Sequence, residues 1–376
     1  MLVQFFENSA QIRDISIIIF GIIGLPFLIW RTISLHNNSR SATIQAKLSE
    51  SRLESERFTK AIELLSHDGV SSSGGIYTLE QISIEQSKYH WIVMETLVAL
   101  IKSRSSLHLI QDGDVEGDTV LETKAAFRVL ARRDSKNDPT NQPIRLTACN
   151  LRGVGAKGGQ FSGAVLSKSD LFRAYLKDSD FSNAQMRGAK LSGIAFDRTN
   201  FSNAHMQHSN LSNSKCWKSK FNRSLLRYTV LDGTDFGQLE ALEVQCRYAV
   251  GRKSSFRGAN LENSSFRDCE FNESDFSNSN FVGASLYAGT FLSCRFSGAV
   301  MKSTSLQRGN FENSDFSNAD LSSANLQNAD FTGCRLDNVN MKNANIQGAL
   351  FDYSTLGKVL NLTDRQKKSA RINSDR

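Results

Sequence analysis

The sequence of 376 residues lacks the short motifs that commonly carry enzymatic chemistry. It has no glycine-rich phosphate loop, no nucleophile elbow and no paired carboxylates in a recognisable cleft. Proline is also scarce, with three residues in the whole chain, and two of them, Pro139 and Pro143, lie in the polar stretch 133–143. The missing motifs argue against an enzyme. The two prolines in this polar stretch mark a boundary near residue 140.

Long apolar runs are scarce too, and one stands out near the N-terminus. The stretch from Ile15 to Trp30 has no charged residue, and it extends to Leu35 if Arg31 reaches toward lipid headgroups. Because about 20 apolar residues span a bilayer, we predict a tail and single transmembrane helix (about 15–35) in residues 1–37. Basic residues concentrate after the run, which predicts a cytoplasmic C-terminal part. A secretory signal and a buried soluble helix are the alternatives.

What the sequence has in abundance is a period of five. Every fifth position from Leu146 to Leu356 is one of 43 slots, and 38 of these slots hold Leu, Phe, Met or Ile. The position two residues before each slot is mostly small. Neither a helix nor a strand generates a strict period of five. A chain that turns a corner every five residues does, so the pattern predicts a solenoid.

A second period, of twenty, gives the number of sides. One column reads Phe236, Phe256, Phe276, Phe296 and Phe316. Like residues at this spacing predict four pentapeptides per turn and hence a square coil. Of the 24 phenylalanines, 17 occupy slots, so most of the aromatic content is expected in the core.

The repeats resemble the pentapeptide-repeat family, whose consensus is A(D/N)LXX. They read ADLSS at 319–323 and ANLQN at 324–328. The resemblance implies a mainly β fold, a right-handed quadrilateral β-helix over 144–356. At 237–251 the usual pattern is reversed: Ala241 and Cys246 stand in slots, and larger residues stand two positions before them. Either one coil is irregular there, or a loop or short helix interrupts the wall.

Cysteine and histidine give no sign of a reactive or metal-binding site. All six cysteines fall on inward positions: Cys149, Cys216, Cys246, Cys269, Cys294 and Cys334. This predicts packing residues in a reducing compartment rather than disulfides or zinc ligands. His205 and His208 face outward without further ligands at the coil spacing. A filled coil also leaves no substrate cavity, so we expect no catalytic residue, metal or cofactor.

Residues 38–133 are predicted to form an α-helical module. Its helices are expected at about 41–65, 76–83, 91–102 and 119–132, with a Ser/Gly break at 71–75. Thr119 and Glu122 fit a capping box at the start of the last helix. Residues 134–143 form a linker.

The segment 357–376 is predicted to hold a short C-terminal helix and tail, opened by a second capping box at Thr363 and Gln366. Open coils expose unpaired strand edges that invite aggregation. The flanking helices are therefore expected to cover the two ends of the coil.

The helical module is similar to that of a group of bacterial membrane-anchored pentapeptide-repeat proteins. The similarity rests on ERFTKAIELL at 56–65 and GGIYTLE at 74–80, although three serines stand at 71–73 where the group usually has an arginine. It implies a single-pass protein of the bacterial inner membrane. It implies no activity.

Basic and aromatic residues gather at outward positions of the repeats. If the coil continues through 237–251, arginines and tyrosines stack on successive coils, beside further basic residues and an outward tryptophan. Such residues are enriched at interface hot spots and also suit single-stranded nucleic acid; a solvated basic wall is the alternative. The candidate partner surface comprises Arg187, Lys215, Trp217, Lys218, Lys220, Arg223, Arg227, Tyr228, Arg247, Tyr248 and Arg267.

The charge pattern disfavours mimicry of duplex DNA, a role that the family resemblance brings to mind. Residues 145–236 carry 14 basic against 6 acidic residues, and 256–356 carry 7 against 11. A rod that is basic near one end poorly imitates a phosphate backbone.

These observations predict a non-enzymatic, membrane-anchored scaffold that presents a rigid coil to an unknown protein partner. The alternatives are a nucleic-acid-binding or topoisomerase-modulating protein and a membrane effector or sensor. Homo-oligomers are possible.

Overall fold

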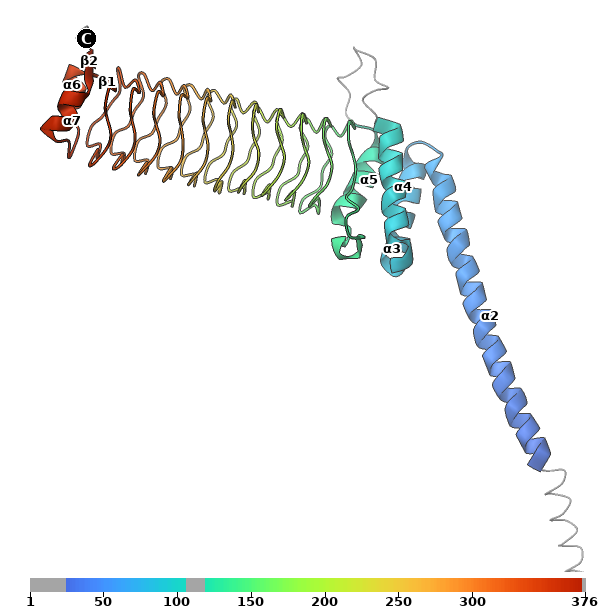
Figure 1. The fold of residues 1–376 in the computed structure, drawn as a ribbon. Helices are drawn as coiled ribbons and strands as arrows, with labels where there is room; N and C mark the ends of the chain where they lie inside the picture. The colour runs from blue at the N-terminus through green and yellow to red at the C-terminus, as the bar shows by residue number, and fades with distance from the viewer. Residues whose placement is uncertain (1–24, 106–118, 374–376) are drawn as a thin grey trace, which may run out of the picture. The chain divides into compact units, whose positions relative to one another are not determined.

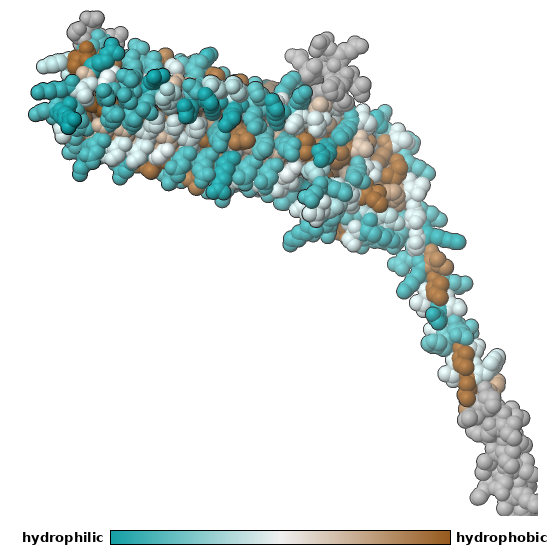
Figure 2. All heavy atoms as spheres, in the orientation of Figure 1, coloured by the Kyte–Doolittle hydropathy of each residue, from teal (hydrophilic) through white to brown (hydrophobic). Residues whose placement is uncertain are grey.

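The computed structural model of the protein describes residues 25–105 and 119–373. The chain divides into two compact units, Met1–Glu63 and Leu64–Arg376, and this division falls inside the predicted helical module 38–133. In the first unit, helix α2 (Leu25–Leu65) is 41 residues long. Large apolar side chains along it, such as Ile33 and Leu48, are exposed. Figure 1 draws this helix as a ribbon, and Figure 2 shows brown, hydrophobic positions along it.

The prediction of a membrane-spanning helix is wrong. Among the described residues, none of the helices is both long enough and apolar enough to cross a bilayer. Helix α2 carries Arg31, Arg40 and Lys47, and charged side chains are costly inside a membrane. Residues 15–24 of the predicted span lie outside the described part of the chain. The predicted inner-membrane location and cytoplasmic orientation rested on that span and fall with it.

Three helices of the second unit form a small bundle (Figure 1): α3 (Val70–Glu85), α4 (Ser87–Ser105) and α5 (Leu121–Arg132). Leu79, Leu97 and Leu130 meet in its core and are fully buried. The predicted Ser/Gly break is wrong, because residues 71–75 lie within α3. Ser72 is buried in the bundle, so tertiary packing overrides the weak local helix preference.

The capping box predicted at Thr119 does not form. Helix α5 begins at Leu121, and its N-cap residue Val120 makes no side-chain hydrogen bond. The Thr119 hydroxyl instead donates to the Asn150 carbonyl at 3.3 Å, and Glu122 accepts from the Gly69 N–H. Partners distant in sequence replace the local cap. A short 3₁₀ helix, η3 (Ser135–Asn137), follows in the predicted linker.

The repeats form a four-sided coil, as the sequence predicts. Two turn residues alternate with a single bridged residue from Arg145 onward, and parallel bridges join residues twenty apart, as in Lys220 to Glu240 and Glu240 to Asn260. The prediction of a mainly β fold is wrong, because each side contributes only one bridged residue between turns. Continuous strands in the described part of the chain are β1 (Leu350–Asp352) and β2 (Arg371–Asn373), which pair in parallel.

Stacked phenylalanines fill the coil. Ring centroids lie 4.8 Å apart between Phe236 and Phe256 and 4.9 Å apart between Phe256 and Phe276. The backbone pattern continues unchanged through 237–251, without a loop or helix. There Leu239 and Val244 occupy the inward positions, two residues before a slot, that are usually small, and both are buried. They compensate for the smaller residues at the neighbouring large slots, so the coil stays filled.

Other elements cover the two ends of the coil. At the first coil, Phe127 of α5 stacks on Phe161 at 4.9 Å, and the Gln160 N–H donates to the Ala131 carbonyl at 2.8 Å. At the last coil lie α6 (Tyr353–Leu356) and α7 (Asp364–Ser369). The capping box predicted for Thr363 and Gln366 is present at the start of α7.

Candidate protein-binding surface

The backbone of the repeats determines which side chains face outward. On each side of the coil the bridged residue and two turn residues point to solvent, and the second turn residue has a positive φ. Glycine and asparagine often occupy this position, but His208, Tyr228 and Tyr248 also adopt φ values of 61°, 58° and 61°. Bulky residues are uncommon in this left-handed region. Their three positions, twenty residues apart, form one column at a corner of the coil.

The three rings of this column form a continuous stack. His208 and Tyr228 lie with centroids 5.0 Å apart and planes at 4°, and Tyr228 and Tyr248 are 4.9 Å apart at 18°. Stacking of Tyr228 on Tyr248 is expected from the sequence. His208 is not among the predicted surface residues, although its spacing of twenty from Tyr228 places it in the same column. Both tyrosines remain partly exposed, at 51% and 38%.

An arginine column runs beside the aromatic stack. Arg227, Arg247 and Arg267 occupy the first turn position of successive coils. The guanidinium of Arg247 lies 4.6 Å from the Tyr248 ring centroid and donates to Asp268 at 3.0 Å. This hydrogen bond raises the pKa of Arg247. Arg247 therefore stays charged over the physiological pH range.

The other two arginines have different partners. Arg227 donates to the Gln245 side chain at 3.1 Å. Because this acceptor is a neutral amide, the contact does not offset the positive charge of Arg227. Arg267 lies 4.8 Å from the centroid of the Tyr287 ring. Arg187 belongs to the same column, but Gln207 separates it from Arg227.

The arginine column forms one edge of a shallow groove of about 610 Å³. Val244, Gln245 and Ser265 line its middle, and Arg223 and Glu243 stand on its other edge. Arg223 pairs with Glu243 at 3.2 Å, and both side chains are more than half exposed, so the pair contributes about 0–1 kcal/mol. Four arginines and a single carboxylate line the groove, which gives it a positive potential.

The predicted surface residues do not form one patch, because the chain changes face every five residues. Four bridge ladders, through positions 215, 220, 225 and 230, define the four sides of the coil. Lys215 and Trp217 belong to the 215 face, and Lys220 belongs to the 220 face. The arginine column belongs to the 225 face. Lys218 and Arg223 lie at corners between faces. The 215 and 225 faces are opposite walls. A flat partner can contact only one of them.

Trp217 belongs to a separate hollow on the 215 face. A Cβ atom at Gly237 would lie 3.1 Å from Trp217 Cδ1, so the missing side chain makes room for the indole. Lys218 approaches the same ring, with Nζ 4.3 Å from its centroid. Asp235 and Arg257 line the hollow as well, which has a volume of about 500 Å³. The charges of Asp235 and Arg257 cancel, so the hollow has no net charge that would favour a charged partner.

The cysteines offer no reactive centre. All six are free and buried, and burial raises the pKa of Cys269 and of Cys294 to about 12. Thiols of this kind are poor nucleophiles at neutral pH. No group of three potential ligands among the described residues could hold a metal ion.

Comparison with known sequences and structures bears on the repeats. The sequence profile described as "Pentapeptide repeats" matches eight copies, over residues 144–183, 179–215, 254–291, 288–318 and 314–352. The stretch 216–253, which contains most of the candidate surface, lies between the matched segments. No curated protein matches the sequence.

Several solved structures are similar to the coil. HetL, a pentapeptide repeat protein involved in heterocyst differentiation regulation from the cyanobacterium Nostoc sp. strain PCC 7120, is 19% identical and covers 58% of this chain and 93% of its own (TM-score 0.27). A pentapeptide repeat protein from the Arabidopsis thaliana thylakoid lumen is 27% identical and covers 32% and 82% (TM-score 0.27). QnrB1, a plasmid-mediated fluoroquinolone resistance protein, is 19% identical and covers 54% and 91% (TM-score 0.31). At such TM-scores the likenesses carry no argument about function, and none bears on the resemblance to the membrane-anchored group.

Proposed function

Because the chain belongs to the pentapeptide repeat family through the repeats of residues 144–215 and 254–352, we propose that it is a non-enzymatic binding protein that presents the 225 face to an acidic protein partner. The observation that carries the proposal is the arginine column of Arg227, Arg247 and Arg267 beside the stacked rings of Tyr228 and Tyr248. Arginine and tyrosine, together with tryptophan, are enriched at interface hot spots.

Electrostatics supports an acidic partner. Successive coils lie ~4.8 Å apart, so the arginine column holds like charges close together. Asp268 offsets the charge of Arg247, but Arg227 bonds a neutral amide. Carboxylates of a partner would relieve the repulsion and could bind each guanidinium through two parallel hydrogen bonds.

The backbone of the wall supports recognition through side chains alone. The Gln245 N–H donates to the Ser224 carbonyl at 3.0 Å, and the Ser265 N–H donates to the Val244 carbonyl at 2.8 Å. Since these groups are paired with neighbouring coils, a partner cannot add a strand to the wall. A rigid wall also loses little conformational entropy when it binds.

The aromatic stack argues against the alternative of single-stranded nucleic acid. Bases bind such proteins by stacking on free aromatic faces. Here His208 and Tyr248 cover the two faces of Tyr228, and Arg247 lies over the Tyr248 ring. The Tyr228 ring therefore has no free face on which a base could stack.

A binding experiment with the full-length chain tests the proposal. We expect the double variant Arg227→Glu, Arg247→Glu to weaken binding of the protein recovered with the wild-type chain at least tenfold. The matched control is Lys190→Glu, Lys342→Glu, which makes the same change in net charge at exposed positions outside the 225 face. Calorimetry with the purified partner gives the dissociation constants.

Two outcomes contradict the proposal. Equal binding by both double variants would remove the 225 face as the interface. Binding of a single-stranded oligonucleotide that weakens steeply with salt, without any protein partner, would favour the nucleic-acid alternative instead.

A further inference from the structure

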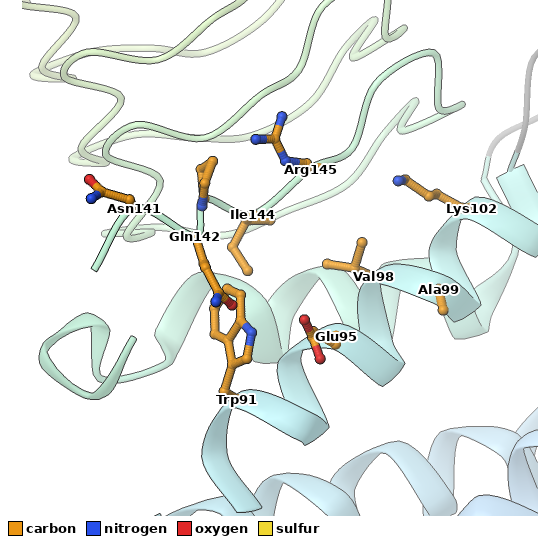
Figure 3. A pocket seen from close by; sticks show the side chains of 10 residues that line it. Trp91, Glu95, Val98, Ala99, Lys102, Asn141, Gln142, Ile144 and Arg145 are labelled. Carbon is orange, nitrogen blue, oxygen red and sulfur yellow. The ribbon is translucent and has the colours of Figure 1, made fainter. Parts of the chain in front are cut away.

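A second hollow lies between helix α4 and the segment that leads into the first coil. Its residue Arg145 begins the bridge ladder of the 225 face, four coils before Leu225. The hollow has a volume of about 400 Å³ and is lined on the coil side by residues 141–145. Figure 3 shows Trp91, Val98 and Lys102 following one another along one face of the helix, with Arg145 on the coil side. This volume falls in the range of small-molecule sites.

The floor of the hollow is apolar. The Trp91 ring and Val98 are partly buried, Ile144 is almost fully buried at 2%, and Ala99 leaves its methyl group exposed between them. Residues 91 and 102 are eleven positions apart, which corresponds to about 16 Å along a helix. The floor is therefore long enough for an extended chain of several methylene groups.

Three polar groups of the hollow lack partners. The Trp91 indole N–H is buried and has no hydrogen-bond acceptor within residues 25–105 and 119–373, which is uncommon for a buried donor. Lys102 and Arg145, by contrast, are exposed, and neither forms an ion pair with another described residue. The hollow thus offers one unused buried donor and two unused cations.

Glu95 sets the direction of a bound anion. It lies on the same helix face between Trp91 and Lys102 (Figure 3). Its carboxylate repels an anionic group placed near Trp91, whereas Lys102 and Arg145 attract one at the other end. A neutral acceptor is what the Trp91 end can receive.

We propose that this hollow binds a medium-chain organic carboxylate that carries a neutral oxygen acceptor at its far end. The carboxylate pairs with Lys102 and Arg145, the chain lies on Val98 and Ala99, and the distal hydroxyl or carbonyl oxygen accepts from the Trp91 N–H. Each unsatisfied group of the hollow then has a partner, and apolar surface is removed from water.

Calorimetric titration of the full chain with 10-hydroxydecanoate, below its micellar concentration, tests the proposal. We expect saturable binding of one ligand per chain. Decane-1,10-diol lacks the charge and should bind at least tenfold more weakly, because it cannot form the ion pairs. Decanoate lacks the hydroxyl and should bind about threefold more weakly, because it loses one hydrogen bond.

Variants assign these preferences to residues. Lys102→Gln and Arg145→Gln should each reduce affinity for 10-hydroxydecanoate at least fivefold, while Lys190→Gln on the repeats should not. Trp91→Phe should remove the difference between 10-hydroxydecanoate and decanoate. Ala99→Phe fills the hollow from an exposed position and should abolish binding without lowering the unfolding temperature.

The proposal is overturned by any of three results. These are no saturable binding of 10-hydroxydecanoate, equal affinity for the diol and the carboxylate, and full binding by the Ala99→Phe variant. A thermal unfolding curve of each variant separates loss of the site from loss of the fold.

Discussion

At the scale of the residue, the coil depends on how each inward position is filled. Gly251 takes a slot that elsewhere holds a large side chain, and the Phe271 ring occupies the space that it leaves: a Cβ atom on Gly251 would lie 2.2 Å from Phe271 Cε1. Phe271 is itself fully buried, so it has no room to move. One missing side chain is thereby matched to one ring on the next coil.

Gly251→Ala should therefore destabilise the protein. We expect a loss of about 1–3 kcal/mol in the free energy of unfolding, the usual cost of overpacking a core, measured by urea denaturation of the full chain. Gly155→Ala is the matched control, because nothing lies within 4 Å of the position of its new methyl group. Equal stability of the two variants would show that Phe271 yields readily.

The buried thiols predict a loss of stability in alkali. Burial raises the pKa of Cys269 from 9.0 to about 12, so the folded chain keeps a proton that the unfolded chain loses above about pH 9. This contribution is intact below pH 9 and declines as the pH rises toward 12, by about 1.4 kcal/mol per pH unit for each such thiol. Between about pH 9 and pH 11, the free energy of unfolding should fall less steeply with pH for Cys269→Ala than for the wild type. An equal fall in both proteins would contradict this.

At the scale of the element, helix ends show when a local signal decides the structure. At α7 the Gln366 N–H donates to the Thr363 hydroxyl, the Thr363 N–H donates to Gln366 Oε1 at 2.9 Å, and Gln366 Nε2 also donates to the Ala344 carbonyl at 2.8 Å. The local cap and the contact with the coil agree. At α5 they compete, and Thr119 bonds Asn150 of the first coil instead.

Removal of the α7 cap should loosen that end of the coil locally. We expect Thr363→Ala to cost about 1 kcal/mol and to speed hydrogen exchange of the α7 amides roughly fivefold, since local opening governs exchange. Thr363→Ser keeps the hydroxyl and should exchange like the wild type. Unchanged exchange in the alanine variant would mean that the contact with Ala344 alone holds the helix.

At the scale of the whole molecule, the elements at the ends of the coil decide whether its terminal edges stay covered. Phe127 stacks on Phe161, which stacks on Phe181 at 5.0 Å, so the aromatic column of the core begins in α5. The Arg133 side chain links the same region, since it donates to the Leu130 carbonyl of α5 at 2.7 Å and to the Gln160 carbonyl of the first coil. The helical bundle and the first coil thus share one core.

Phe127→Ala should open the first coil. Truncation of a buried phenylalanine costs about 3–5 kcal/mol, and an uncovered coil edge can pair with another chain. We expect a lower unfolding temperature and concentration-dependent association in light scattering. Phe127→Leu retains most of the apolar volume and should associate no more than the wild type under the same conditions if association arises from the open end.

The repeat architecture follows directly from the sequence. Its period of five fixes which side chains point inward, and its period of twenty fixes which stack, as Phe236 on Phe256 and Tyr228 on Tyr248 show. These rules are local, because each coil repeats the same turn, and so they can be read without coordinates. The short C-terminal helix was predictable for the same reason, since Thr363 and Gln366 are only three residues apart.

Tertiary structure alone decided the rest. Residues 71–75 join a helix because the bundle buries Ser72, against their local preference. The predicted surface divides between opposite walls, because Trp217 and Arg227 are ten residues and therefore two corners apart. The hollow beside Trp91 arises where a helix meets the first coil. Each of these depends on packing between segments distant in sequence, and a local pattern carries no information about which distant segment will pack against it.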